Sequence, residues 1–195
     1  MQVKPIGVIH TPFHEVKGTP IQSRAGEGVE GWVEVFPEFV AGLKDLSGFE
    51  RIWLVYRFDR TAAREINLHV TPCLDTKSHG VFASRAAARP NLIGMSAVCL
   101  LGVRRNRLKI RGIDILDGTP LLDIKPYIAQ FDCFQVARNG WLGETNGAAL
   151  ADGRLERDEA GKGETCRKEA AGRKRVSLGE MGEITRLSAS ALKGA

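Results

Sequence analysis

Five short apolar segments, separated by Gly, Pro and Asp, constrain the fold more than any other feature of this chain. They are VKPIGVI (3–9), WVEVF (32–36), RIWLVYRF (51–58), IGMSAVCLLGV (93–103) and RLKIRGIDIL (107–116). Alternation of apolar and polar residues in the second and fifth is typical of strands with one face in water. Helix-like spacing occurs only in PEFVAGLKDLSG (37–48), and its glycines keep that helix short. The pattern predicts a mainly β fold, an antiparallel barrel or sandwich with short helices.

The end of the chain differs in composition from the first 143 residues. Residues 144–195 are rich in Gly, Ala and charges of both signs, and they contain few large apolar side chains. Such a segment buries too little apolar surface to offset the entropy lost on ordering. We therefore predict a folded domain over residues 3–143 and a poorly ordered, charged tail over residues 144–195.

The sequence gives no indication of a membrane or secretory segment. No apolar run approaches the roughly 20 residues of a membrane-spanning helix, and the first residues, MQVKPIGVIH, lack the regions of a secretory signal. Cysteines stand far apart, without a C-x-x-C pair, at Cys73, Cys99, Cys133 and Cys166. This spacing argues against a structural zinc site or a disulfide framework and favours free thiols in the cytoplasm.

A glycine-rich stretch, AGEGVEGW (25–32), has the spacing G-x-G-x-x-G of dinucleotide-binding loops. That fingerprint requires a strand before it and a helix after it, because the helix N-terminus binds the pyrophosphate. Here the preceding KGTPIQSRA is not strand-like, and the following WVEVF alternates as a strand does. We therefore interpret the stretch as a flexible loop that leads into a strand.

An unusual arginine-containing segment, HGVFASRAAARPNLIG, covers residues 79–94. Pro90 restricts Arg89 to extended geometry, and Asn91 suits a turn. Two forked, permanently charged guanidinium groups, those of Arg85 and Arg89, suit a carboxylate or a phosphate. From the residues alone, the alternative that they brace acidic loops of the protein is open. His79, next to this segment, is a further candidate site residue.

The segment GIDILDGTPLLDIKPY (112–127) combines a turn signal with several acidic residues. Asp117-Gly118 between apolar runs is typical of a hairpin turn. Asp114, Asp117 and Asp123 lie near it, and paired carboxylates can serve as acid–base groups or metal ligands. Their spacing matches no oxygen-ligand loop, so we expect no metal site.

Taken together, PIGVIHTPF (5–13), GTPIQ (18–22), VEVFPEFVAGLKDLSGF (33–49), HGVFASRAAARPNLIGMS (79–96) and GIDILDGTPLLDIKPY (112–127) resemble the TsaA-like (TrmO) family in order and spacing. The resemblance covers about residues 3–143. It implies a β-barrel that works as a homodimer and binds S-adenosylmethionine in a cleft near the dimer interface. The implied reaction is N6-methylation of a threonylcarbamoyl-modified adenosine beside the anticodon of tRNA.

Carried over residue by residue, the resemblance implies a set of cofactor contacts. They fall on Pro20, Ile21, Gln22, Asp59, Arg60, Arg85, Met95, Asp114, Ile115, Leu116 and Asp117. This set has suitable chemistry, because an arginine can bind the carboxylate of the methionine moiety and Asp can bind ribose hydroxyls. Asp117 and Asn91 are candidates for the catalytic group, and Arg89, Lys125 and Tyr127 for contacts with the RNA.

The charge of the domain is compatible with RNA as a partner. Residues 1–143 hold 18 Lys and Arg against 14 Asp and Glu, so most of the net charge of +5 lies in the predicted domain. Two other functions are open: a methyltransferase that uses the same cofactor on another substrate, and a non-catalytic barrel that binds RNA or senses the cofactor.

Overall fold

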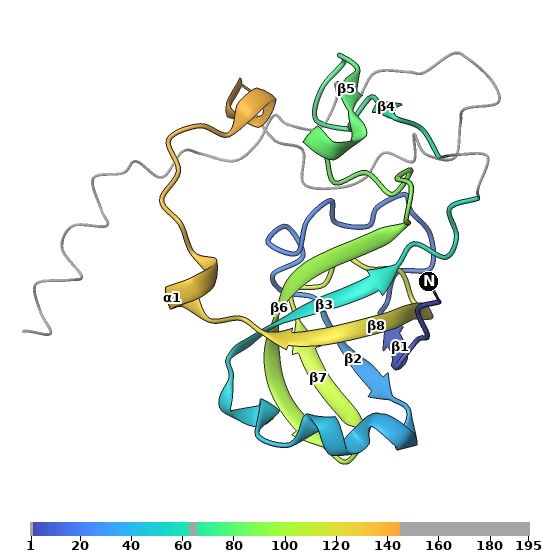
Figure 1. Cartoon of the computed structure of the whole chain (residues 1–195), viewed down its shortest axis with the longest axis vertical. Helices are drawn as coiled ribbons and strands as arrows, with labels where there is room; N and C mark the ends of the chain where they lie inside the picture. Colours follow the sequence, from blue (N-terminus) through green and yellow to red (C-terminus); the bar gives the residue numbers. More distant parts are fainter. Residues whose placement is uncertain (1, 63–65, 145–195) are drawn as a thin grey trace, which may run out of the picture. The chain divides into compact units, whose positions relative to one another are not determined.

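Six antiparallel strands form a closed barrel in the computed structural model, which describes residues 2–62 and 66–144 (Figure 1). The strands are β1 (Gly7–His10), β2 (Glu30–Val35), β3 (Arg51–Arg57), β6 (Ile93–Arg104), β7 (Arg107–Arg111) and β8 (Thr119–Pro126). Their order around the barrel is β1-β2-β7-β6-β3-β8, and β8 closes it by pairing with β1. The mainly β prediction is confirmed, and the barrel implied by the family resemblance is the architecture found. Closure removes the exposed edges that an open sheet would present.

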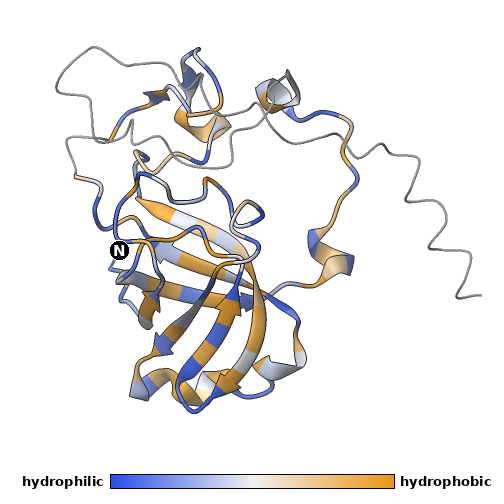
Figure 2. Cartoon of the chain, turned by 180° about the vertical axis from the view of Figure 1, so that it is seen from behind, coloured by the Kyte–Doolittle hydropathy of each residue, from blue (hydrophilic) through white to orange (hydrophobic). Residues whose placement is uncertain are grey.

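Along each strand, residues face the interior and the exterior of the barrel in turn, and the inward-facing apolar side chains fill the interior. On β3, Ile52 and Leu54 are fully buried, while Trp53 and Val55, which alternate with them, face outward and are half-buried. Figure 2 shows the same alternation of apolar and polar residues along the strands. The other inward-facing residues of the core include Ile9, Val33, Val35, Val98, Leu108, Ile110 and Leu121. Each such side chain contributes about 1.5–3 kcal/mol relative to its exposed state, so the barrel supplies the core that the composition allows.

The segment between β7 and β8 differs from the sequence-based prediction. β7 ends at Arg111, because Gly112 adopts a φ of +82° that no regular strand accommodates. Asp117-Gly118 does form a turn, with φ of +77° at Gly118, but the predicted hairpin is wrong. Asp117 accepts a hydrogen bond from the backbone N–H of Thr11, and β8 then pairs with β1 and β3 rather than with β7.

The helices of the described residues are all short, as expected. The predicted helix over 37–48 is two 3-10 turns, η1 (Pro37–Leu43) and η2 (Leu46–Gly48), separated at Asp45 by a φ of +64°. The others are η4 (Val81–Ala83), α1 (Ala129–Asp132) and η5 (Gly140–Glu144). Two further short strands, β4 (His69–Val70) and β5 (His79–Gly80), pair with each other.

Several predicted features lie partly or wholly outside residues 2–62 and 66–144. Apart from Glu144, the predicted tail lies outside the described residues. Among the residues that are described, no helix is long and apolar enough to cross a membrane. Cys99 and Cys133 carry free thiols, while Cys166 lies outside the described part. The cytoplasmic location stays a prediction.

Candidate functional site

Polar residues from three distant segments interact with one another next to the inward-facing side of β6. Arg85 donates a hydrogen bond through Nη1 to the Oε1 atom of Gln22, although the two residues are 63 positions apart. The positive charge of Arg85 also acts on the carboxyl group of Asp114, in the segment that follows β7. We call this group, together with Ser96 and Tyr56 of the adjoining strands, the carboxylate site.

Asp114 is the residue of the carboxylate site with an unmet requirement. Among the described residues, its Oδ1 is the one buried side-chain nitrogen or oxygen without a hydrogen-bond partner. Burial raises the pKa of Asp114 to about 6, while hydrogen bonds from Ser96 and from the backbone of Ser23, and the charge of Arg85, act in the opposite direction. An unpaired buried acceptor costs about 1–3 kcal/mol, so this oxygen fits a hydrogen-bond donor of a ligand.

Behind Asp114 lies a short chain of buried hydroxyl groups. The Tyr56 hydroxyl is 3.1 Å from the Ser96 hydroxyl. Ser96 also acts on the carboxyl of Asp114 as a hydrogen-bond donor that lowers its pKa. Burial raises the pKa of Tyr56 and the nearby charge of Asp114 raises it further, so the phenol is neutral at physiological pH. The sequence prediction missed both residues. Their signal was available, because polar side chains at inward-facing strand positions interrupt an otherwise apolar pattern.

A second polar cluster surrounds Asp117. Its Oδ1 lies 3.4 Å from Nδ1 of His10, and its Oδ2 lies 3.7 Å from Nδ1 of His14. Arg60 donates to the backbone carbonyls of His14 and Asp117 and thereby connects the loop after β3 to this cluster. The predicted residues Arg60 and Asp117 therefore lie together. Asp59 is exposed, and no side-chain contact joins it to them in the described residues.

The glycine-rich loop packs directly against the backbone that leads to Asp114. A Cβ at Gly26 would overlap the carbonyl oxygen of Ile113, and one at Gly31 would overlap the carbonyl oxygen of His10. These glycines are therefore required for close packing, while Gly28 has nothing within 4 Å of its Cβ position. Strand β2 follows the loop, as expected, so no helix N-terminus is present here to bind a pyrophosphate.

Four further predicted cofactor contacts adjoin the two clusters, whereas the fifth, Met95, lies on the outward face of β6 and lines the outer pocket described below. Pro20 is buried beside Gly26. The backbone carbonyl of Ile21 accepts a hydrogen bond of 2.7 Å from the side-chain amide of Gln22. The carbonyl of Ile115 accepts the Thr11 hydroxyl at 2.8 Å, and that of Leu116 accepts the Thr119 hydroxyl at 2.7 Å. These two carbonyls thus have partners within the protein.

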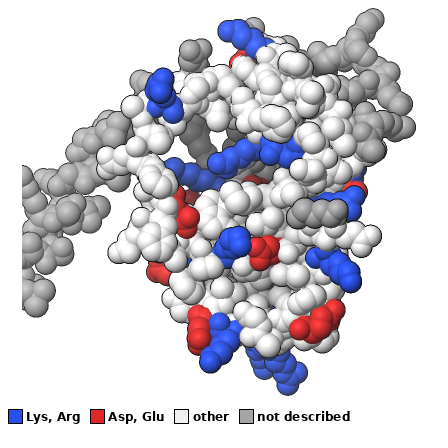
Figure 3. Space-filling model, in the orientation of Figure 1, with Lys and Arg blue, Asp and Glu red and all other residues white. Residues whose placement is uncertain are grey.

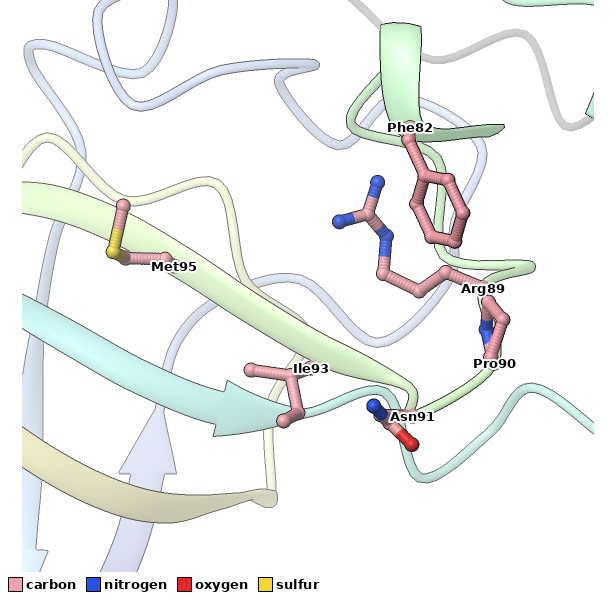
Figure 4. Close-up of a pocket in the computed structure, with 6 residues that line it drawn as sticks. All are labelled: Phe82, Arg89, Pro90, Asn91, Ile93 and Met95. Atoms are coloured by element: carbon pink, nitrogen blue, oxygen red, sulfur yellow. The ribbon is translucent and has the colours of Figure 1, made fainter. Parts of the chain in front are cut away.

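An open pocket of about 310 Å³ adjoins the outer face of β6 (Figure 4). It is lined by Phe82, Arg89, Pro90, Asn91, Ile93 and Met95. Figure 4 shows Ile93 and Met95 on the strand, residues 89–91 on the segment leading into it, and Phe82 on η4. Phe82 is 79% exposed and Met95 54% exposed. We call this the outer pocket; its walls are mainly apolar, and Arg89 and Asn91 supply its polar groups.

Arg89 is held by the loop that it belongs to. Its Nε donates to the carbonyl of Ala86 at 2.9 Å, and its Nη2 donates to the carbonyls of Val81 and Ser84 at 3.1 and 2.8 Å. The guanidinium therefore braces a loop of the protein, but its partners are backbone carbonyls and not the acidic side chains that the sequence suggested. This rigid loop positions Asn91 and one wall of the outer pocket.

Lys125 and Tyr127 lie away from the outer pocket. Lys125 forms an ion pair of 2.8 Å with Asp123, and the Tyr127 N–H donates to Arg51, at the start of β3. The outer pocket adjoins the other end of that strand, because Ile93 pairs with Arg57. At about 3.3 Å per residue the two ends of β3 are roughly 20 Å apart, so Arg89 and Tyr127 do not lie together.

His79 has partners that tie two segments to each other. Its Nε2 lies 2.9 Å from the Asp75 carboxylate, and its ring stacks on Trp141 at a centroid distance of 4.5 Å. The indole N–H of Trp141 donates to Ala83 at 2.8 Å, so η5 is attached to the segment that includes η4. His79 thus serves packing in this structure. No group of three or more His, Cys, Asp or Glu with metal-binding geometry occurs in the part of the chain that is described.

Lys and Arg side chains form a band across the face shown in Figure 3. Acidic side chains are interspersed with basic ones below this band. Among the described residues, ion pairs such as Lys109–Glu30, at 2.7 Å, neutralise part of the basic charge. A basic band of this kind favours a polyanionic partner over a neutral one.

The closed barrel, with polar loops around an incompletely satisfied carboxylate, defines a small-ligand-binding barrel rather than a Rossmann domain. The model of the tRNA-methyltransferase O N-terminal domain family matches residues 8–133, and the chain belongs to this family. The resemblance found in the sequence is thereby confirmed.

Named relatives align with this chain over most of the barrel. A Pyrococcus abyssi protein named "Probable S-adenosyl-L-methionine-binding protein" is 55% identical over 139 residues, covering 71% of this chain and 74% of its own length. The human "tRNA (adenine(37)-N6)-methyltransferase" is 34% identical over 136 residues, covering 66% of this chain and 30% of the human protein. The crystal structure of TrmO from Pseudomonas aeruginosa matches with a TM-score of 0.60 and 39% identity, covering 72% of this chain and 62% of that one. The cofactor named for the Pyrococcus relative agrees with the predicted one.

Proposed function

We propose that this protein is an S-adenosylmethionine-dependent methyltransferase that acts on tRNA. The observation that carries the proposal is the carboxylate site, where Gln22, Arg85 and Asp114 come together around a buried acceptor that has no partner. Membership of the TrmO family and the names of its relatives support the same conclusion. The target is the adenosine next to the anticodon, modified with a threonylcarbamoyl group.

The residues of the carboxylate site suit the groups of this cofactor. Asp114 Oδ1 would accept a hydrogen bond from a ribose hydroxyl, and Arg85 would bind the methionine carboxylate. Gln22 has an amide that can read the edge of the adenine, and it is already held by Arg85. When bound, the cofactor supplies a sulfonium methyl group, so the main task of the protein is to bind and align donor and acceptor.

The outer pocket is proposed to contact the RNA on the acceptor side. An exposed aromatic ring such as Phe82 can stack on an unstacked base of an anticodon loop, and Asn91 can hydrogen bond to a base edge. An exocyclic adenine nitrogen is a poor nucleophile, and its proton must be removed during methyl transfer. Asp117, flanked by His10 and His14, and Asn91, in the outer pocket, are two separate candidates for the group that handles this proton.

We further propose a homodimer located in the cytoplasm. Large apolar side chains are exposed on β6, where Met95 is 54% exposed, and after β8, where Phe131 and Phe134 are 68% and 77% exposed. Covering such residues by a second copy would remove apolar surface from water. Light scattering coupled to size-exclusion chromatography tests this, and a monomer at micromolar concentration would contradict it.

A methyl-transfer assay on two tRNA pools tests the proposed reaction. The protein and methyl-labelled cofactor are incubated with bulk tRNA from cells with and without the threonylcarbamoyl modification. Label in the modified pool alone is expected. Label in both pools would reject the stated substrate, and label in neither would reject tRNA methylation and leave another substrate or a non-catalytic binding role.

A further inference from the structure

The buried hydroxyl groups of Tyr56 and Ser96 have no role in the function proposed so far. They lie on neighbouring strands, where Tyr56 of β3 pairs with Gly94 and Leu54 pairs with Ser96 of β6. Both residues are buried, with exposed fractions of 5% and 4%. A polar pair at this depth requires a full set of hydrogen bonds, and together with Asp114 it forms one continuous chain.

The number of hydroxyl hydrogens determines which group donates in each of these hydrogen bonds. An ionised carboxylate is only an acceptor, so the single hydroxyl hydrogen of Ser96 must point to Asp114. The Ser96 oxygen can then only accept in its contact with Tyr56, and the Tyr56 hydroxyl must donate across the 3.1 Å contact. Tyr56 stays protonated at neutral pH, because burial and the charge of Asp114 raise its pKa. The order of donation is therefore Tyr56 to Ser96 to Asp114.

Gly94 allows Tyr56 to take this position. A Cβ at residue 94 would collide with the ring of Tyr56 and would also approach Phe58. The ring of Phe58 meets that of Tyr56 edge to face at a centroid distance of 5.4 Å. The phenol is thus enclosed by packing, and its hydroxyl is directed to Ser96.

We infer that Tyr56 and Ser96 are positioning residues for the cofactor: they hold Asp114 in its ionised form, with Oδ1 left as the acceptor for a hydroxyl donor of the ligand. This inference rests on the proposed function, because it takes S-adenosylmethionine as the ligand of the carboxylate site. The groups that act on Asp114 are three donors, namely Ser96 from β6 and the backbone N–H groups of Ser23 and Asp114, together with the Arg85 guanidinium; the neutral phenol of Tyr56 from β3 lies near it. Arg85 and the three donors all favour the charged carboxylate, whereas burial opposes it.

A pH dependence of cofactor affinity follows. The pKa of Asp114 is about 6 in the ligand-free protein, so the carboxyl is protonated below this pH and the acceptor is lost. The dissociation constant for S-adenosylmethionine is expected to be about tenfold higher at pH 5 than at pH 7. Ser96→Ala removes a donor to the ionised form, so the midpoint moves to higher pH by about half to one unit. Tyr56→Phe moves it in the same direction by less.

Titration calorimetry with S-adenosylmethionine from pH 5 to 8 tests the inference. Wild type, Ser96→Ala, Tyr56→Phe and Asp114→Asn are compared, with the exposed Ser47→Ala as the matched control, which keeps the wild-type midpoint. The order of midpoints expected is Ser96→Ala above Tyr56→Phe above wild type, and Asp114→Asn binds weakly without this pH dependence. Ser96→Cys, a similar-sized but weaker donor, replaces Ser96→Ala if that variant does not fold.

Two unfavourable outcomes separate the inference from the proposed function. If Asp114→Asn weakens binding while Ser96→Ala, Ser96→Cys and Tyr56→Phe keep the wild-type midpoint, the positioning role is wrong and the cofactor site stands. If Asp114→Asn binds as tightly as wild type with the same pH dependence, the carboxylate site is not where this cofactor binds. Carbon NMR of the Asp114 carboxyl in the ligand-free variants gives the same midpoints without any ligand, and unchanged values there would overturn the inference.

Discussion

Replacing Asp114 by Asn is expected to stabilise the ligand-free protein at neutral pH. Folding raises the pKa of this carboxyl from 3.8 to about 6, mainly because burial disfavours its charged form. The folded state therefore binds the proton more tightly than the unfolded state. The stabilising contribution of protonated Asp114 is fully present below about pH 3.8 and is lost as the pH rises through 6.

The size of the effect follows from that shift. A difference of about two pKa units corresponds to ~3 kcal/mol of unfolding free energy lost by wild type between pH 4 and pH 7.5. Asn cannot ionise, so Asp114→Asn avoids this loss. We expect its unfolding free energy to exceed that of wild type by about 1–3 kcal/mol at pH 7.5, because Asn reproduces only part of the hydrogen bonding, and to show no excess at pH 4.

Urea unfolding of the two proteins at pH 4, 6 and 7.5, without cofactor, measures this difference. The comparison cancels the titration of groups that both proteins share. Asp117→Asn is the control, since it removes a charged acceptor of the Thr11 N–H without relieving a buried charge, and a small destabilisation is expected. An Asp114→Asn variant that is less stable than wild type at pH 7.5, or a difference that does not change with pH, would refute the reasoning.

Three further predictions concern the loops around the two sites. Gly26→Ala is expected to lower the unfolding free energy by about 1–3 kcal/mol in urea, because its Cβ would overlap the Ile113 carbonyl, whereas Gly28→Ala changes it little; equal effects would contradict the packing described. Arg89→Ala removes a donor from the carbonyl oxygens of Ala86, Ser84 and Val81, of which Val81 still accepts from Ser84, so hydrogen exchange of the amides in residues 81–91 should accelerate, and unchanged protection would show that the guanidinium does not brace the loop. Phe82→Ala removes a 79% exposed ring, so stability should stay within about 0.5 kcal/mol of wild type while tRNA methylation falls; unchanged methylation would remove the outer pocket from the proposed acceptor side.

Strand positions were the part of the fold that local sequence could predict. The short apolar segments that predicted β2, β3 and β6 lie within two residues of the observed bounds of these strands, because each strand has one face in a dry interior. β8 was not recognised as a strand, since Pro120 and Asp123 interrupt its apolar residues. Which strands β8 pairs with depends on the contact between Asp117 and Thr11, the residue after β1. No local sequence pattern contains this contact.

The candidate site could be predicted by residue but not by geometry. The family resemblance named Gln22, Arg85 and Asp114, which are brought together only when the barrel closes. Ser96 and Tyr56 were missed although they interrupt the apolar pattern of their strands, because only the register of β3 and β6 sets the two hydroxyl groups side by side. Arg89 shows the reverse case: its residue type suggested a ligand, whereas the loop around it supplies its partners.

A crystal structure with S-adenosylhomocysteine, the form of the cofactor that remains after methyl transfer, tests the central claim most directly. The account predicts density for the ligand at the carboxylate site, with a ribose hydroxyl within hydrogen-bond distance of Asp114 Oδ1 and the amino-acid carboxylate near Arg85. Ligand density elsewhere on the barrel, with Asp114 Oδ1 still without a partner, would contradict it.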